Sequence, residues 1–404
     1  MGINTSVTAG GETLKGTIKA LNYTGIRWIR IGPNNGNTTK EIITLHNRTG
    51  AKVDYGLLSG YTNITALVDT AKILAQHGAL LAIEGNNEPN NFGIAYRGKK
   101  GGNGSSWLPV AKVQRNLYRT VKNDSVLHRY PVWNISESGA EHPNVGLQFL
   151  TIPKTAQTKM PAGTRYADYA NCHNYITHPS WPGLHDNQTW RSASPDSLCP
   201  VDGLYGNYGR TWRNHYEGYR QSRLQTLPRV TTETGYPTGD KVTEKIQGRL
   251  YLDLYLSQFK RGWSYTAIYL LRIRNYEIST DKPFAIFNNN YTPKLPARYL
   301  HNFTTILADK KPVSSPGRLN FSIPDKPKTV HDLLLQKSNR KFYLVVWGEK
   351  FKGGSENITL HMEKRHHSMK IYDPTVGTSP VRSVGHTHSI HLTMNDHPIV
   401  IEIG

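Results

Sequence analysis

Apolar and polar residues alternate in two distinct ways along the first three quarters of the chain. Short apolar runs that end at Gly, Asn or Pro predict buried strands. Eight such runs occur, at residues 2–7, 26–31, 53–58, 79–84, 131–136, 169–175, 229–234 and 265–271. Between them, apolar residues recur at the spacing of a helix face. The predicted helices lie at residues 13–22, 64–77, 110–122, 212–225, 244–260 and 296–307.

Eight strands that alternate with helices are typical of a (β/α)8 TIM barrel, an α/β fold. A doubly wound open sheet is the competing arrangement, and the strand count favours the barrel. After residue 312 the period changes to two, which predicts short antiparallel strands. We therefore expect a barrel over residues 1–312 and a smaller C-terminal all-β sandwich over residues 313–404. The sandwich is expected to cover a flank of the barrel, with carbohydrate binding as its alternative role.

The chain is strongly basic, with 49 Lys and Arg against 29 Asp and Glu in 404 residues, a net charge of +20. Such a charge favours polyanionic partners. The basic residues are spread along the whole length and no nucleic-acid recognition module is present, so we expect no nucleic-acid partner. An acidic polysaccharide matches the charge better. No apolar run is long enough to span a membrane, so no membrane span is expected.

The chain enters a strand-like segment directly after Met1, which leaves no room for an export signal. We expect a secreted or periplasmic protein whose signal has been trimmed, with an intracellular protein as the alternative. Only two cysteines are present, Cys172 and Cys199, without metal-ligand spacing. A disulfide between them is expected in an exported protein, and two unrelated thiols are the alternative. No cofactor and no metal are predicted.

Two short glutamate motifs carry the chemistry. Glu88 lies in the stretch Asn86-Asn87-Glu88-Pro89-Asn90, just after the fourth predicted strand, and Glu233 ends the seventh. In a parallel barrel the carboxyl ends of all strands open on one face, so the two side chains are expected to meet across one cleft. Cleavage of a glycosidic bond requires one carboxylic acid to protonate the leaving oxygen and one carboxylate to meet the sugar carbon. Two facing glutamates satisfy that requirement.

These motifs resemble the signature of the retaining glycoside hydrolases of clan A. The resemblance covers the whole chain in architecture and a few short motifs in residues. It implies that Glu88 is the acid/base and Glu233 the nucleophile, and we expect the pKa of Glu88 to be raised in a partly desolvated cleft. The run around residues 284–307 resembles families that carry an appended sandwich, such as families 39 and 79. Residues 88–92 are also similar to the heparanase pattern.

Three further residues agree with this resemblance. His173 and Tyr175, which end the sixth strand, resemble the clan's His-x-Tyr motif, in which the tyrosine hydroxyl steadies the nucleophile. Arg30, which ends the second strand, is similar to an arginine that neighbours the nucleophile in several clan families, and Glu84 is its expected buried partner. The amide of Asn87 is expected to bind a sugar 2-hydroxyl.

The end of the eighth strand departs from the clan. In place of the usual tryptophan or acid it carries Arg272 and Arg274, which suit the carboxylates of a uronic acid. The alternative is that they pair with structural acids such as Glu277 or Asp281. Sugar stacking would then come from a tryptophan elsewhere, although a tryptophan is more often a core residue. The candidates are Trp133, Trp181, Trp190 and Trp263.

Glu137 and Glu141, after the fifth strand, are candidates for shaping a sugar subsite, with a structural role as the alternative. The long connections at residues 93–107 and 178–210 are expected to wall the substrate groove. Together these features predict a retaining β-glycoside hydrolase that cuts a polysaccharide internally. The alternatives are a catalytically silent carbohydrate-binding protein on a degenerate barrel and a basic nucleic-acid or surface-binding protein.

Overall fold

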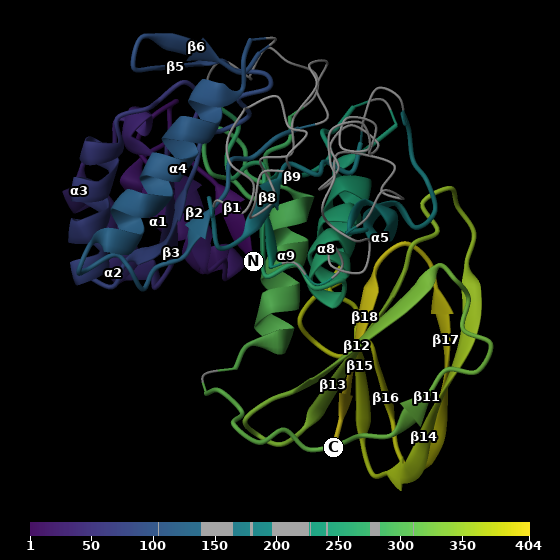
Figure 1. The fold of residues 1–404 in the computed structure, drawn as a ribbon. Coiled ribbons are helices and arrows are strands. Elements are labelled where there is room, and N and C mark those ends of the chain that lie inside the picture. Colours follow the sequence, from purple (N-terminus) through teal and green to yellow (C-terminus); the bar gives the residue numbers. More distant parts are fainter. Residues whose placement is uncertain are drawn as a thin grey trace.

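The computed structural model describes residues 1–103, 105–138, 165–177, 181–195, 226, 228–239, 241–274, 283–309 and 311–404. Its largest sheet has eight parallel strands in the order β7-β4-β3-β2-β1-β10-β9-β8. A parallel bridge between Trp133 and Tyr169 joins β7 to β8 and closes the sheet into a barrel. Figure 1 shows how the helices and strands of the protein are arranged. The strands are β1 (Gly2–Asn4), β2 (Trp28–Ile31), β3 (Lys52–Gly56), β4 (Leu80–Glu84), β7 (Val132–Trp133), β8 (Ala170–Cys172), β9 (Arg229–Thr234) and β10 (Tyr265–Ile268).

All eight predicted strands are confirmed, and several are shorter than expected. The fifth covers only Val132–Trp133 where residues 131–136 were expected, because the chain leaves the sheet there to form the site described below. The expected loop at residues 93–107 contains a two-stranded hairpin, β5 (Ile94–Tyr96) and β6 (Lys99–Gly101).

Helices surround the barrel, and the predicted ones are confirmed except for residues 212–225, which lie outside the described residues. They are α1 (Leu14–Thr24), α3 (Ile64–Gln76), α4 (Leu108–Asn123), α8 (Glu244–Lys260) and α9 (Leu295–Leu307). Two more were not expected, α2 (Thr39–Thr49) and the short α5 (Gln188–Ser192). The apolar face of α2 is too narrow to stand out, but a capping box between Thr38 and Glu41 marks its start. None of the helices in the described part of the chain has the length and apolar character needed to cross a membrane.

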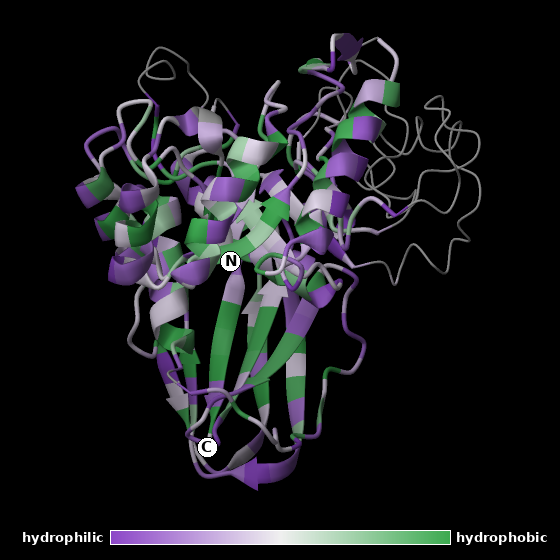
Figure 2. Ribbon diagram, turned by 60° about the vertical axis from the view of Figure 1, so that its left-hand side comes forward, coloured by the Kyte–Doolittle hydropathy of each residue, from purple (hydrophilic) through white to green (hydrophobic). Residues whose placement is uncertain are grey.

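The C-terminal region is a sandwich of two antiparallel sheets, as expected. One sheet has the order β11-β14-β17 and the other β12-β13-β18-β15-β16. Apolar residues colour its strands green in Figure 2, and the facing side chains of Leu344, Val346, Ile358, Leu360 and Ile401 form its core. The strands are β11 (Phe321–Ser322), β12 (Val330–Gln336), β13 (Phe342–Gly348), β14 (Glu356–His366), β15 (Met369–Tyr372), β16 (Arg382–Val384), β17 (Thr387–Met394) and β18 (Pro398–Ile403).

The sandwich packs on the barrel through α5 and α8. Glu349, fully buried, accepts hydrogen bonds from the Thr189 hydroxyl at 2.8 Å and the Ser257 hydroxyl at 3.0 Å. Nearby, the Trp190 ring stacks on the His331 ring with their centroids 3.9 Å apart. These contacts give the sandwich a structural role in covering the barrel flank.

The interior of the barrel has two layers of different character. An aromatic layer is formed by Trp28, Trp133, Tyr169 and Tyr265 packed against one another. Two residues further along the same strands, towards their carboxyl ends, side chains point into the same space because strand side chains alternate with period two. There the residues are polar, and Arg30 follows Trp28 in this way on β2. This polar layer supports the site.

Candidate active site

The loop after β4 is shaped by its own side chains. Gly85 is required because a Cβ there would lie 2.0 Å from the Gln114 amide oxygen and 2.9 Å from the Ile135 nitrogen. The Asn86 amide donates to the Tyr61 carbonyl at 2.6 Å, and the Asn90 amide to the Ser138 carbonyl at 2.8 Å. These bonds hold Glu88 with a φ of 39°, a left-handed conformation that is uncommon outside glycine and concentrated at functional sites.

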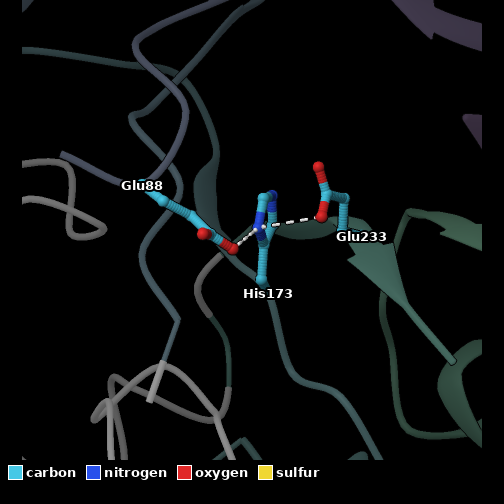
Figure 3. A group of neighbouring side chains, drawn as sticks. All are labelled: Glu88, His173 and Glu233. Carbon is cyan, nitrogen blue, oxygen red and sulfur yellow. Dashed lines mark hydrogen bonds and ion pairs between the residues drawn. The ribbon is translucent and has the colours of Figure 1, made fainter. Parts of the chain in front are cut away.

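Glu88 and Glu233 face each other across the ring of His173 (Figure 3). Nδ1 of His173 lies 2.6 Å from Oε1 of Glu88 and 3.6 Å from Oε2 of Glu233. One oxygen of each carboxylate and the histidine nitrogen all lie within 4.8 Å of one another. The structure thus brings together the two glutamates that the sequence places 145 residues apart.

A local irregularity in β9 aims Glu233 into the cleft. Between Thr231 and Thr234 this strand has one residue more than the facing stretch of β10. Such a bulge lets neighbouring residues deviate from strict alternation and is common next to active sites. As a result Thr232 and Glu233, adjacent in sequence, both contact side chains of the site.

Both oxygens of Glu233 are held by donors. Nη1 of Arg30 donates to Oε1 at 2.6 Å, and the Tyr175 hydroxyl donates to Oε2 at 2.8 Å. Burial, followed by the charges of Glu233 and Glu88, raises the pKa of the Tyr175 phenol well above its ordinary value. Tyr175 is therefore a neutral donor, as expected from the His-x-Tyr motif.

Arg30 bridges the polar layer to Glu233. Its Nε and Nη2 donate to the two oxygens of Glu84 at 2.6 Å and 2.9 Å, the bidentate geometry that guanidinium and carboxylate favour. Burial would lower the pKa of Arg30, but the charges of Glu84 and Glu233 outweigh it and raise it. Burial likewise acts to raise the pKa of Glu84, and Arg30 overcomes it, so that this pKa lies below its ordinary value. Burial, then the Glu84 charge, raises the pKa of Asp54 well above its ordinary range.

The hydrogen bonds of Thr232 determine which nitrogen of His173 carries a proton. The Thr232 hydroxyl donates to Oε1 of the ionised Glu84 at 2.8 Å, so its oxygen accepts from Nε2 of His173 at 3.1 Å. Nε2 is therefore protonated. Nδ1, on the other side of the ring, lies 2.6 Å from Oε1 of Glu88.

This arrangement corrects the expected pKa of Glu88. Burial does act to raise it, but the hydrogen bond and charge of His173, together with the Asn91 amide at 2.9 Å, outweigh burial and bring the pKa below its ordinary value. The sequence predicts that Glu88 faces a cleft, but it does not predict that a histidine will contact it.

Glu88, His173 and Glu233 could also offer three ligand atoms to a metal ion. The Arg30 guanidinium, 2.6 Å from Glu233, would repel such a cation and compete for the same oxygen. The donor set thus fits proton chemistry better than metal binding.

Asn87 and Glu137 lie at the same end of the barrel. The Asn87 oxygen accepts from Nη2 of Arg30 at 2.9 Å, and its amide donates to the Ser59 hydroxyl at 3.0 Å. Glu137 is 1% exposed, and its backbone carbonyl accepts from the backbone N–H of His173 at 2.9 Å. Both residues contact side chains or backbone of the site, and direct contact with a sugar stays a prediction for each.

Two of the expected substrate contacts are corrected by the structure. Trp133 is 0% exposed and packs edge-on against Trp28 with ring centroids 5.5 Å apart, so it is a core residue and offers no face to a sugar. Arg272 is 5% exposed, and its Nε and Nη1 donate to backbone carbonyls, including that of Asn289 at 2.6 Å, so these two donors are used within the fold.

The other candidate tryptophans pack against neighbouring side chains. Trp263 is buried, Trp190 packs beneath the sandwich, and the half-buried Trp181 stacks on His185. Four other residues named in the sequence analysis lie outside the described residues. They are the subsite candidate Glu141, the disulfide candidate Cys199, and Glu277 and Asp281, the acids considered as partners of the arginines.

Several residues of the site were missed from the sequence. Asn171 donates to Glu84 at 2.8 Å. It lies two residues before His173 in a strand, so the alternation of strand side chains could have predicted that both point to the same face. At the end of the eighth strand the aromatic residue is Tyr269, whose ring packs on Phe284 with centroids 5.8 Å apart. Phe284 in turn contacts Tyr175, which donates to Glu233, so a row of aromatic side chains lies beside Glu233.

No family model matches the chain, and no curated protein matches its sequence. Solved structures match its fold. A family 39 glycoside hydrolase from Bacteroides cellulosilyticus WH2 has a TM-score of 0.61 at 15% identity, covering 100% of this chain and 80% of that one. A glucosidase from Croceicoccus marinus has a TM-score of 0.55 at 10% identity, covering 96% and 91%. A GH51 arabinofuranosidase from Xanthomonas axonopodis pv. citri has a TM-score of 0.53 at 12% identity, covering 96% and 89%. At these identities the likeness shows that the chain has the fold of these proteins.

Proposed function

We propose that the protein is a retaining β-glycoside hydrolase that cleaves a polysaccharide. The observation that carries the proposal is the pair of carboxylates, Glu88 and Glu233, with oxygens within 4.8 Å of each other. Retaining enzymes hold their two carboxyl groups about 5–5.5 Å apart, whereas inverting enzymes leave about 6.5–9.5 Å for a water molecule. The spacing here favours retention.

In the first step Glu233 attacks the anomeric carbon while Glu88 protonates the leaving oxygen. A bond forms between Glu233 and the sugar, and the glycosidic bond breaks. Arg30 and Tyr175 hold the attacking carboxylate in a fixed orientation through bonds of 2.6 Å and 2.8 Å, which reduces the entropy lost on reaching the transition state.

In the second step Glu88, now a carboxylate, takes a proton from a water molecule that attacks the same carbon. The bond to Glu233 breaks and the sugar leaves with its original anomeric configuration. In both steps the proton moves on Glu88, and His173 lies beside it with Nδ1 2.6 Å from Oε1.

The net charge of +20 favours an acidic polymer, and we propose internal cleavage of such a chain. A polymeric substrate suits a secreted or periplasmic enzyme. The similarity of the fold to glycoside hydrolases of families 39 and 51 supports a carbohydrate substrate.

The test is product release from a panel of neutral and uronic-acid-containing polysaccharides, with the product anomer followed by NMR. Wild type is compared with Glu233→Ala and Glu88→Ala, and with Glu363→Ala on the sandwich as a matched control. We expect retained products from wild type and the control, and none from Glu233→Ala. Sodium azide should restore turnover to both Glu233→Ala and Glu88→Ala. The two variants should release glycosyl azides of opposite anomeric configuration. Inverted products would disprove the double displacement, and equal activity of Glu233→Ala would disprove its role.

A further inference from the structure

A cavity lies apart from the catalytic pair, where the β5–β6 hairpin meets the start of α4. Its volume is about 540 Å³, within the range of about 300–1,000 Å³ typical of ligand sites. The hairpin stands at the end of the barrel opposite the sandwich (Figure 1). The cavity is lined by Tyr96, Arg97, Lys99, Lys100, Ser106, Leu108, Pro109, Lys112, Arg115 and Asn116.

All of the charged side chains that line this cavity are cations. Five of its lining residues are cations and none is an acid, and none of the five forms an ion pair within the part of the chain that the structure describes. Nε of Arg115 is buried without a hydrogen-bond partner. Like charges gathered in a concave site repel one another, and an anion bound there would relieve that repulsion.

The remaining lining groups also suit an anionic sugar. The Tyr96 hydroxyl accepts from the Asn116 amide at 2.6 Å, and the Arg97 guanidinium lies over its ring at 5.4 Å, so the tyrosine is held in place. The sixteen-residue helix α4 begins in the cavity wall, and the N–H groups of a helix start favour negative charge. Aromatic face, guanidinium forks and lysines together fit a carboxylated or sulfated sugar.

The cavity is connected to the catalytic loop by the backbone. The Asn103 nitrogen donates to the carbonyl of Pro89, the residue after Glu88, at 2.8 Å. Gly102 approaches the same carbonyl so closely that a Cβ would lie 2.1 Å from it. The hairpin is thus built on the loop of the proposed acid, and that acid faces the leaving group of the substrate.

We infer that this cationic cavity binds carboxylate or sulfate groups of an acidic polysaccharide on the leaving-group side of the cleft. The inference rests on the proposed function, because the role of Glu88 decides which part of the polysaccharide lies on the leaving-group side. Its binding step does not require turnover.

The experiment measures dissociation constants in the Glu233→Gln background, so that no cleavage occurs. The pocket variant is Lys99→Ala/Lys112→Ala/Arg115→Ala, and the matched control removes three exposed cations from α1 and α2, Lys15→Ala/Lys19→Ala/Lys40→Ala. The probes are polygalacturonate and its methyl-esterified form, dextran sulfate and dextran, and a short DNA duplex. Thermal melting checks that each variant is folded, and Lys99→Ala/Lys112→Ala serves if the Arg115 change prevents folding.

We expect the pocket variant to bind polygalacturonate, dextran sulfate or both about tenfold more weakly, and the control to lose less than about twofold. Loss on polygalacturonate alone would assign carboxylates, and loss on dextran sulfate alone would assign sulfate esters. Equal losses in the pocket and control variants, no loss, or binding only to DNA would overturn the inference. Cleavage without pocket-dependent binding would contradict this inference alone, and pocket-dependent binding without cleavage in wild type would contradict the proposed function alone.

Discussion

The aromatic and polar layers of the barrel interior use the same strands in the same way, yet they have opposite character. On β4, Ala82 belongs to the first layer and Glu84 to the second, and on β9 Val230 and Thr232 repeat this order. The first layer is filled by rings in contact, with centroids 5.1 Å apart for Trp133 and Tyr265. The second is filled by charges and amides that hydrogen-bond to one another.

The difference shows what each layer does. An aromatic layer stabilises the fold through buried apolar surface and packing. A buried charge network contributes little net stability, because desolvation offsets most of its Coulomb energy. Glu84 accepts four hydrogen bonds from Arg30, Asn171 and Thr232, which satisfies its charge. The network holds Arg30 and His173 against the two glutamates, so its benefit is the geometry of the site.

The largest expected effect on catalysis comes from changing Glu233, which the polar layer holds through Arg30. Glu233→Gln should lower kcat/KM by about 10⁴-fold or more, since the nucleophile is lost. The unfolding free energy should change little, because the amide oxygen still accepts from Arg30. Kinetics with the polysaccharide found in the panel and urea unfolding measure the two effects. A large loss of stability with normal kinetics would reverse the contrast between the layers.

The aromatic layer should respond in the opposite way. Trp133→Ala removes a fully buried ring and should cost about 3–5 kcal/mol of unfolding free energy. The folded fraction should turn over at close to the wild-type rate, because the Trp133 ring packs on Trp28, Tyr169 and Tyr265, and the backbone bond of its carbonyl to Gly85 is kept in the variant. Urea unfolding and kcat at low temperature check this, with Trp181→Ala as a half-buried control. A specific fall in kcat would show that Trp133 acts on the site.

Glu84→Gln tests whether the polar layer also supports the fold. The change removes one charge from a buried bidentate pair and should cost about 1.5–3 kcal/mol. Arg30 would then be held less firmly against Glu233, so kcat/KM should fall as well. Unfolding and kinetics are measured on the same samples. Unchanged kinetics would mean that the charge of Glu84 is not needed to position Arg30.

The smallest expected effect is a shift in the pH profile. His173→Phe removes the interaction that lowers the pKa of Glu88 and leaves its burial, so that pKa should rise. General-acid catalysis is lost as pH rises through this pKa, so the basic limb of kcat/KM should move to higher pH. The exposed His388→Phe is the control. A limb that stays in place or moves to lower pH would exclude His173 as the cause.

The sequence by itself determined the architecture and most of the surroundings of Glu88 and Glu233. Strand runs, helix faces and the punctuation at strand ends are local signals, and they were sufficient to predict eight strands, the sandwich and the meeting of Glu88 with Glu233. Arg30, His173 and Tyr175 also lie where their motifs predict. Their positions follow because parallel strands bring all their carboxyl ends to one face.

Only the tertiary structure decided how each side chain is used. Trp133 ends a strand as a platform residue would, but the barrel turns its ring onto Trp28. Arg272 meets backbone carbonyls, and the pKa of Glu88 is lowered by a histidine that is distant in sequence. The bulge in β9 follows from its register against β10. Burial, register and charge environment depend on neighbours from other strands, and a local pattern carries no information about them.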